Sequence, residues 1–387
     1  MNQTEFNRRH VMALIGAATA TGLAGPARAQ DAALKLWAPG IARVGAEDWS
    51  DMEAQAGTAI NAIAKSARAD EAIQKMVVGD GNALYDAMTD NGGGMEDALA
   101  SQGAIVELDV SRIPNWSNLL TVYEEGATSG DTIRSDGNVY GIPYISNADS
   151  LAFNHDEIGE ELTSWEALFD SQFRGRAAMQ NDFGPTLTNT AIYLKQSGKG
   201  SIDNPSDMTE DEVRQTCEFL IDLKKKGHFR TFWDGVQNGA DLLSSEEVLV
   251  SSCWEVIQIF AARTNGQDIR YGTMKEGHQA WNNIVMLTRG GQERGMEDAF
   301  YGLANVYLSP WFGARTLAGL GFTPQMEGVG EYIEANPDEF GEDVRAELVD
   351  RLARKAARRE NPGNSWQNVF PTNIRAYQDW WARVQAA

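Results

Sequence analysis

The sequence predicts an α/β protein with two lobes, and three observations lead to this expectation. The chain has 387 residues, which is enough for a large core and long for a single domain. Strand-like and helix-like segments alternate along it, which favours α/β layers over a helical bundle or a β-sandwich. Neither an internal repeat nor a low-complexity tract interrupts the alternation. We therefore expect two α/β lobes rather than one.

The first thirty residues differ from the rest of the chain. Arg8 and Arg9 precede a short apolar run rich in Gly and Ala, and ARAQ at 27–30 has the small-x-small pattern of a cleavage site. This is the pattern of a twin-arginine export signal over residues 1–29. The run is short and interrupted by Pro26, unlike a membrane span. We expect a periplasmic mature chain without a transmembrane segment.

The mature chain is strongly acidic. Removal of residues 1–29, which carry three arginines and one glutamate, changes the net charge from −22 to −24. Such a surface repels nucleic acid and anionic lipid headgroups, so neither is an expected partner. Cys217 and Cys253 are the two cysteines, and the sequence leaves open whether they are bridged or free.

Strand patterns recur from the mature N-terminus onward. They fall at 33–39, the end of 72–89 after a GDGN turn, 151–155, 176–181, 246–255, 269–274 and 283–288. Two helix starts carry a capping-box pattern, Thr163 with Glu166 and Thr209 with Glu212. The second of these helices ends at Gly227.

A further helix is predicted near the C-terminus. Residues 342–360 have the pattern of a solvated helix with one apolar face. The side chains expected to point inward are Val344, Leu348 and Leu352.

The usual catalytic and metal-binding motifs are missing. His155, His228 and His278 are the histidines of the mature chain, and none has the spacing of a zinc site. There is no GxSxG motif and no Walker loop. We expect a binding function, no enzymatic activity, no metal and no cofactor.

Tryptophan is abundant, with eleven in the chain. Four are predicted at the ends of strands, where open α/β sheets bind ligands: Trp37, Trp254, Trp281 and Trp311. Three lie on evident helices and are expected in the core: Trp165, Trp380 and Trp381.

Seven motifs in order resemble one family. They include the stretch 136–182 with IPYI, TSWEAL and FRG, the NWSNL at 115–119, and the later segments CWEVIQIFAARTNGQ, AWNNIV, LGFTP and NSWQNVF. In these the chain resembles the periplasmic solute-binding proteins of ABC transporters, of the spermidine/putrescine-binding type. The resemblance implies a type II binding protein whose two lobes are joined by three crossings, near IPYI, AWNN and GFTP, with a ligand cleft between the lobes.

The same resemblance gives lobe boundaries and partners. It implies an N-terminal lobe of residues 30–143 plus 282–326 and a C-terminal lobe of 144–281 plus 327–387. It also implies a membrane permease and a cytoplasmic ATPase as partners of the ligand-loaded protein.

The expected ligand contacts follow from the matching motifs. Positions that match the family's pocket are Trp37, Asp182, Trp254, Trp281, Phe322 and Gln367. The chain departs from the polyamine binders at Asn283, where they have an aspartate, and at Pro185, where they have an acid. Two of three expected carboxylates are absent, whereas the aromatic residues remain.

This pattern favours a ligand without N–H donors. Burial of an ammonium group without a carboxylate costs several kcal/mol, whereas aromatic rings stabilise a methylated cation by roughly 0.5–2 kcal/mol each. Asn283 is expected to hydrogen-bond an oxygen of the same ligand. In these features the chain is similar to the trimethylamine N-oxide-binding proteins of this transporter group. Choline, glycine betaine and carnitine fit the same criteria.

Alternative ligands remain at this point. A polyamine is the main one, and it requires acids outside the matched motifs to replace those that are lost. Glu124, Glu125 and Asp131 are acids that can reach the mouth of the cleft, although a solvated surface role is the simpler interpretation. A metal-chelate or thiamine receptor is disfavoured because no tyrosine cluster is evident.

Overall fold

The computed structural model describes residues 33–44, 48–65, 69–125, 131–359 and 365–387. The predicted export signal lies outside the described residues. The described chain divides into two compact units. Unit 1 contains the chain through Tyr144 together with Asn283–Gly319 and Pro324–Ala335. Unit 2 contains Ile145–Asn282, Leu320–Thr323 and Asn336–Ala387. The units differ from the expected lobe boundaries at Tyr144, at Asn282, and at residues 320–323 and 327–335.

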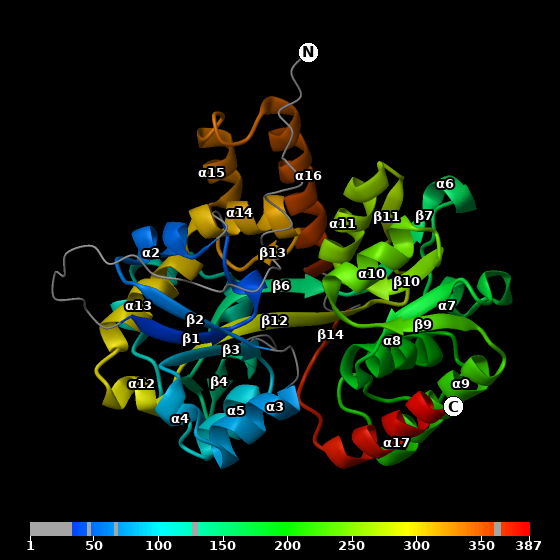
Figure 1. Cartoon of the computed structure of the whole chain (residues 1–387), viewed down its shortest axis with the longest axis horizontal. Helices are drawn as coiled ribbons and strands as arrows, with labels where there is room; N and C mark the ends of the chain where they lie inside the picture. Colours follow the sequence, from blue (N-terminus) through cyan, green and yellow to red (C-terminus); the bar gives the residue numbers. More distant parts are fainter. Residues whose placement is uncertain (1–32, 45–47, 66–68, 126–130, 360–364) are drawn as a thin grey trace, which may run out of the picture. The chain divides into compact units, whose positions relative to one another are not determined.

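The first sheet has the strand order β13–β6–β12–β3–β1–β2, with β14 joined to β12. Its strands are β1 (Leu34–Ala38), β2 (Ile60–Ala64), β3 (Ala87–Asn91), β6 (Ile142–Ala148), β12 (His278–Leu287), β13 (Thr323–Pro324) and β14 (Ser365–Gln367). β1 pairs in parallel with both β2 and β3, whereas β12 runs antiparallel to β3. The carboxyl ends of β2, β1 and β3 therefore lie side by side at one edge (Figure 1).

Unit 1 also contains a set of mostly short helices. They are α2 (Ser50–Ala56), α3 (Ala69–Ile73), α4 (Gly81–Leu84), α5 (Met95–Ser101), α12 (Arg289–Glu293), α13 (Glu297–Tyr307), α14 (Pro310–Leu320, whose last residue belongs to unit 2) and α15 (Val329–Ala335). Trp37 of β1 and Ile284 of β12 share a buried cluster with Leu99 of α5. Successive strand residues alternate between faces, which places Trp37 on the face toward α5.

Unit 2 contains a sheet of order β11–β7–β10–β8–β9. The strands are β7 (Ser150–Asn154), β8 (Ala177–Gln180), β9 (Phe229–Trp233), β10 (Val250–Cys253) and β11 (Ile269–Tyr271). β8 is parallel to β9 and β10, and β7 is antiparallel to β10 and β11. With helices packed on each of the two sheets, the predicted α/β class with two sheet-containing lobes is confirmed.

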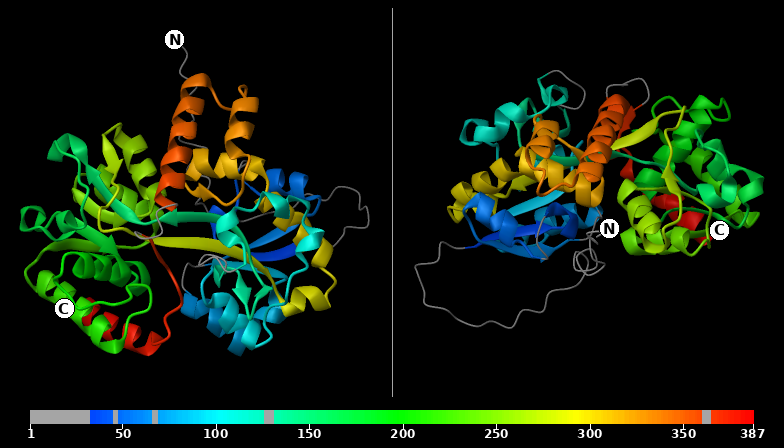
Figure 2. Two further views of the ribbon diagram at one scale, coloured as in Figure 1. Left: turned by 180° about the vertical axis from the view of Figure 1, so that it is seen from behind. Right: turned by 90° about the horizontal axis from the view of Figure 1, so that it is seen from above.

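The helices of unit 2 vary widely in length. They are α6 (His155–Ile158), α7 (Glu166–Phe169), α8 (Phe183–Gln196), α9 (Glu210–Lys225), α10 (Gly235–Ser244), α11 (Glu255–Asn265), α16 (Glu342–Arg359) and α17 (Ile374–Ala386). The C-terminal helix α17, red in Figure 2, packs along α9. Trp165 and Trp381 are buried in the core, as predicted, and Trp380 packs against it.

Two of the three predictions about helix ends and faces needed correction. The capping box of Thr209 and Glu212 at the start of α9 is confirmed. The one expected at Thr163 and Glu166 is wrong. Helix α7 begins at Glu166, and Ser164 Oγ accepts the hydrogen bond from the Glu166 backbone N–H instead.

The apolar face of α16 is narrower than expected. Leu348 is buried, but the side chain of Val344 is 41% exposed, so its predicted inward orientation is wrong. Val344 lies in the first turn of the helix, one turn before the buried Leu348. A period of 3.6 residues identifies a face but not how far along the helix that face is covered.

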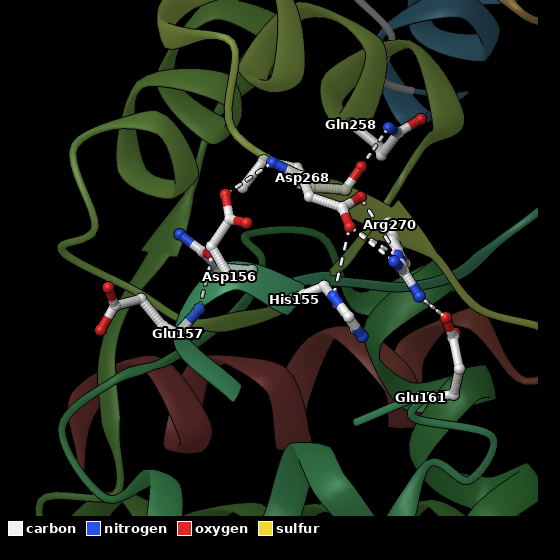
Figure 3. Close-up of polar contacts among 9 residues, drawn as sticks. His155, Asp156, Glu157, Glu161, Gln258, Asp268 and Arg270 are labelled. Atoms are coloured by element: carbon white, nitrogen blue, oxygen red, sulfur yellow. Dashed lines mark hydrogen bonds and ion pairs between the residues drawn. The ribbon is translucent and has the colours of Figure 1, made fainter. Parts of the chain in front are cut away.

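A polar network fixes one edge of the second sheet (Figure 3). The carboxylate of Asp268, just before β11, accepts hydrogen bonds from Nε and Nη2 of Arg270 and pairs with Nδ1 of His155 at 3.2 Å. Arg270 also pairs with Glu161, and Asp156 of α6 accepts the backbone N–H of Asp268. These contacts join α6 to the edge strand β11 and use His155 structurally.

Candidate ligand-binding residues

Trp281 and Asp149 form an indole–carboxylate pair in unit 2, hereafter the unit 2 pair. The Trp281 Nε1–H donates to Asp149 Oδ1 over 2.8 Å. The ring also contacts Phe322 edge to face, with centroids 5.5 Å apart and planes at 75°. Asp149 lies at the junction of β6 and β7. Its backbone N–H donates to the backbone carbonyl of Gln279, and its own carbonyl accepts from His278 Nδ1. Two contacts with β12, a backbone carbonyl and the His278 side chain, thus hold the Asp149 backbone next to the strand that carries Trp281.

Asp149 is a buried acid without a cationic partner among the described residues. Its side chain and backbone together are only 2% exposed, and the hydrogen bond from Trp281 is the contact recorded for its carboxylate. Burial raises the pKa of Asp149 to about 7, against the effect of the Trp281 hydrogen bond, and the negative charge of Asp182 adds to the rise. A buried carboxylate in this state attracts a cation that can reach it.

Gln279 adds unpaired polar atoms to the same strand face. It lies two residues before Trp281 in β12, so both side chains point to one side of the strand. Gln279 is completely buried, and neither its amide oxygen nor its amide nitrogen has a hydrogen-bond partner within the described part of the chain. Buried amides are normally paired with protein, water or ligand. The Trp281 face of β12 therefore offers both donor and acceptor capacity.

Asp182, Trp254 and Gln367 also fall in unit 2 but differ in exposure and role. Asp182 is the N-cap of α8, and its Oδ1 accepts from the Gly184 N–H over 2.9 Å. Pro185 follows in the first turn of α8, where its missing backbone N–H costs no helical hydrogen bond. Trp254, the N-cap residue of α11, contacts Trp233 edge to face at 5.4 Å.

Gln367 lies in β14 and donates to Asn282 Oδ1 over 3.2 Å, which ties this strand to β12. It is only partly buried.

Trp37, a predicted ligand contact that falls in unit 1, lies close to an aspartate and a lysine. Its ring stacks on Tyr85 with centroids 4.8 Å apart and planes at 7°. The Lys65 ammonium lies 5.2 Å from the Trp37 centroid and forms an ion pair with Asp90 Oδ2 at 3.0 Å. We call Trp37, Asp90 and Lys65 the unit 1 triad. The Lys65 and Asp90 side chains are 3% and 2% exposed.

The strand order explains how the unit 1 triad assembles. Trp37 lies near the end of β1, Lys65 follows β2, and Asp90 lies near the end of β3. These strands are parallel neighbours, so their carboxyl ends meet at one edge. Burial raises the pKa of Asp90, and the ion pair with Lys65 opposes this rise.

Asn283 has partners inside unit 1. Its Nδ2 donates to Asn91 Oδ1 over 3.0 Å, and its Oδ1 accepts from the Tyr144 hydroxyl over 3.4 Å. The Asn91 contact spans the antiparallel pairing of β12 and β3. Asn283 thus serves as a cross-strand amide contact as well as a candidate ligand contact.

Other predicted features have simple locations. Trp311 lies in α14 rather than at a strand end, with Arg315 over its ring at 4.9 Å, so that expectation was wrong. Trp281 lies inside β12, which begins at His278, five residues before the strand predicted at 283–288. Glu124 and Glu125 are exposed and line a surface hollow of unit 1 together with Trp116 and Arg134. Asp131 is exposed.

Both cysteines are free and buried. Burial raises the pKa of the Cys217 thiol to about 12 and that of Cys253 well above its usual range, so neither is a reactive thiolate. The described residues contain no group of three or more His, Cys, Asp or Glu side chains suited to a metal ion. Within the same residues no helix is both long and apolar enough to cross a membrane.

Sequence reasoning missed Asp149, Gln279, Lys65 and Asp90. For Asp149 the signal was weak, an acid in the turn NADS between two strands. For the unit 1 triad the rule on carboxyl ends of parallel strands was available, but β2 was not recognised as a strand. Its sequence INAIA alternates poorly, so its end could not be located.

The two α/β units and the ligand-type residues on them are those of a binding protein. The chain belongs to the family of bacterial extracellular solute-binding proteins, whose model matches residues 46–336. This is a family of solute-binding proteins and not of enzymes, in agreement with the binding function expected from the sequence.

Among individual proteins, the chain is 25% identical over 237 residues to the putrescine/agmatine-binding protein of Pseudomonas aeruginosa. The match covers 58% of this chain and 60% of that relative, so the chain spans less than two thirds of its length.

Solved structures share the fold at low identity. The spermidine/putrescine ABC transporter substrate-binding protein PotD of Streptococcus pneumoniae is 13% identical, with a TM-score of 0.67 over 91% of this chain and 98% of that one. The Tp0655 (TpPotD) lipoprotein of Treponema pallidum is 15% identical, with a TM-score of 0.68 over 91% and 99%. At these identities the likeness supports the type II binding-protein fold alone.

Proposed function

We propose that the protein is the periplasmic substrate-binding component of an ABC importer and captures a small aliphatic amine of the polyamine class. Its export by the twin-arginine route and its delivery of ligand to a permease with an ATPase belong to the same proposal. The ligand carries at least one primary or secondary ammonium group. That group binds the carboxylate of the unit 2 pair.

Asp149 is the observation that carries this proposal. A polyamine requires carboxylates to replace those absent at positions 185 and 283, and Asp149 is such an acid, outside the positions matched by sequence. It is buried, it has no cationic partner among the described residues, and its Oδ1 is already bonded to Trp281. An ammonium that reaches this carboxylate gains a charge-assisted hydrogen bond. The indole ring beside it contributes a cation–π contact.

The nearby groups fit a cation better than an anion. Asp182 is close enough to raise the pKa of Asp149, so two negative charges act on the same region. Within the described residues no Lys or Arg lies over the Trp281 ring, whereas lysine or arginine lies over several other aromatic rings. The putrescine/agmatine-binding relative agrees with an amine of this class.

A methylated amine is the second candidate, with trimethylamine N-oxide as the specific ligand and choline or glycine betaine as variants. The edge-to-face pair of Trp281 and Phe322 favours it, because two aromatic rings can wall a trimethylammonium group. The neutral amide of Asn283 suits a ligand oxygen. A trimethylammonium group has no N–H to donate to the buried carboxylate of Asp149, which places this candidate second.

Calorimetric titration of the mature protein tests the choice. Putrescine, agmatine, spermidine, trimethylamine N-oxide, choline and glycine betaine are titrated at pH 8 into the native protein and into the Trp281→Ala and Trp380→Ala variants. We expect binding of the amines with N–H groups, loss of that binding in Trp281→Ala and retention in Trp380→Ala. Trp380 is a matched control because it is a partly buried tryptophan on α17, outside the unit 2 pair.

The outcomes separate the candidates. Binding of methylated amines alone supports the second candidate and removes the role given to Asp149. Equal loss in both variants indicates damage to the fold rather than to the site. Absence of heat with every amine contradicts the proposal as a whole.

A further inference from the structure

The unit 1 triad has the composition of an ammonium-binding site that already contains its ammonium. An indole ring, a buried carboxylate and a primary ammonium meet at the carboxyl edge of three parallel strands. The ammonium is that of Lys65, a residue of the chain itself. Its Nζ lies 3.0 Å from Asp90 Oδ2 and 5.2 Å from the Trp37 centroid.

The contacts of Lys65 are those a primary-amine ligand would make. A carboxylate satisfies one N–H and the charge, and an indole ring contributes the cation–π contact. Asp90 is held for this role because its other oxygen accepts the Asn91 backbone N–H over 2.8 Å. Trp37 is held by the parallel stack with Tyr85. Both groups are therefore fixed by unit 1 independently of the lysine side chain.

We propose that Trp37 and Asp90 form an ammonium-binding position in unit 1 that Lys65 fills. This position takes primary ammonium groups, since only an N–H donor satisfies the carboxylate. The lysine side chain ends in the same alkylammonium group as a linear polyamine. A free alkylammonium ion can therefore replace Lys65 once its side chain is shortened.

Thermal unfolding tests the ammonium-binding position at Trp37 and Asp90 without reference to transport or to the natural ligand. Lys65→Ala removes the atoms that correspond to n-propylammonium. We expect n-propylammonium chloride to raise the midpoint of thermal unfolding of this variant saturably, by about 2–4 °C. The native protein should show no such rise at equal ionic strength. Sodium chloride and 1-propanol are the controls for salt and for a neutral chain of equal length.

A double variant with the net charge of the native protein tests whether the response requires the Asp90 carboxylate rather than the cavity alone. Lys65→Ala with Asp90→Asn keeps the cavity but removes the carboxylate, and it should not respond to n-propylammonium. Where Lys65→Ala alone does not fold, Lys65→Ala protein refolded with and without n-propylammonium gives the same test by yield. An equal response of the double variant, or none in Lys65→Ala, overturns the proposal and leaves Lys65 as a structural ion pair.

Discussion

The unit 1 triad and the unit 2 pair use the same two chemical groups in opposite states. Each places a carboxylate beside a tryptophan that is less than 10% exposed. In unit 1 the charge of Asp90 is balanced by Lys65 at 3.0 Å. In unit 2 the Asp149 carboxylate accepts a hydrogen bond from the Trp281 N–H and has no counter-charge among the described residues. The first arrangement is complete without a ligand, and the second is not.

The difference shows how a buried acid can serve either stability or binding. A buried ion pair is costly to break, because the remaining charge is left without a partner. A buried acid without a counter-charge destabilises the folded chain in its ionised form and so gains from a cationic ligand. The opposite signs of these two effects lead to the following predictions.

The largest expected effect is on stability in unit 1. Asp90→Asn leaves the Lys65 ammonium buried without its counter-charge, and we expect a loss of about 3–5 kcal/mol in the free energy of unfolding. Urea denaturation at pH 8 measures it. Asp338→Asn, a change at an exposed aspartate, is the control and should stay within about 0.5 kcal/mol of native. A loss below about 1 kcal/mol would show that the pair is not held as described.

The same substitution in unit 2 should act in the opposite direction. The folded-state pKa of Asp149 is raised to about 7, so the folded chain keeps this proton while the unfolded chain loses it near pH 4. Stability from this group is therefore lost as pH rises from about 4 to 7. Asp149→Asn should raise the unfolding free energy at pH 8, by up to about 4 kcal/mol.

Denaturation at pH 8 and pH 4 measures this change. At pH 4 the side chain is protonated in the folded state and about half protonated in the unfolded state, so the free energy of unfolding of the variant should be close to native. A variant that is less stable than native at pH 8 would argue that Asp149 has a counter-charge and would break the comparison.

Amine affinity should depend on pH through the same group. A cationic ligand requires ionised Asp149, so binding below pH 7 must release a proton. We expect affinity to fall up to about tenfold per pH unit below 7 and to be flat between pH 7.5 and 9, where the amine remains protonated. Calorimetry over pH 5.5–9 tests this.

The groups close to Asp149 limit the interpretation. Asp182, Cys253 and His278 are its titratable neighbours. Asp149→Asn should weaken binding and remove the pH dependence together. A pH profile that survives in this variant assigns the dependence to one of these neighbours instead.

The smallest expected effects concern the second aromatic ring of each arrangement. Phe322→Leu removes the edge-to-face partner of Trp281, and Tyr85→Leu removes the stacked partner of Trp37. Such pairs contribute about 0.5–1.5 kcal/mol beyond area burial. We expect Phe322→Leu to weaken amine binding by about 2–10-fold, and Tyr85→Leu to lower stability with amine affinity within about twofold of native. Titration and denaturation of both variants measure this, and reversal of the two outcomes would contradict the assignment of the two regions.

Local pattern was enough to predict many of the elements. The alternation of ALKLWAP predicts β1, and Thr209 with Glu212 predicts the start of α9, because both signals lie within a few neighbouring residues. Prediction failed where a distant partner decided the outcome. At the start of α7 the hydroxyl of Ser164, rather than that of Thr163, accepts the hydrogen bond from the Glu166 backbone N–H. The same hydroxyl donates to Glu276, more than a hundred residues away, and this distant contact holds it in place.

The sequence by itself determined the α/β class, the family motifs and the identity of the aromatic residues, since these depend on short-range pattern and composition. Only the tertiary structure decided which acids accompany which rings. Asp149 meets Trp281, 132 residues later, because β12 passes beside the β6–β7 junction. Asp90 and Lys65 meet at Trp37 because β2, β1 and β3 are parallel neighbours. Charge balance in a buried site is a property of such long-range contacts, and no local pattern encodes it.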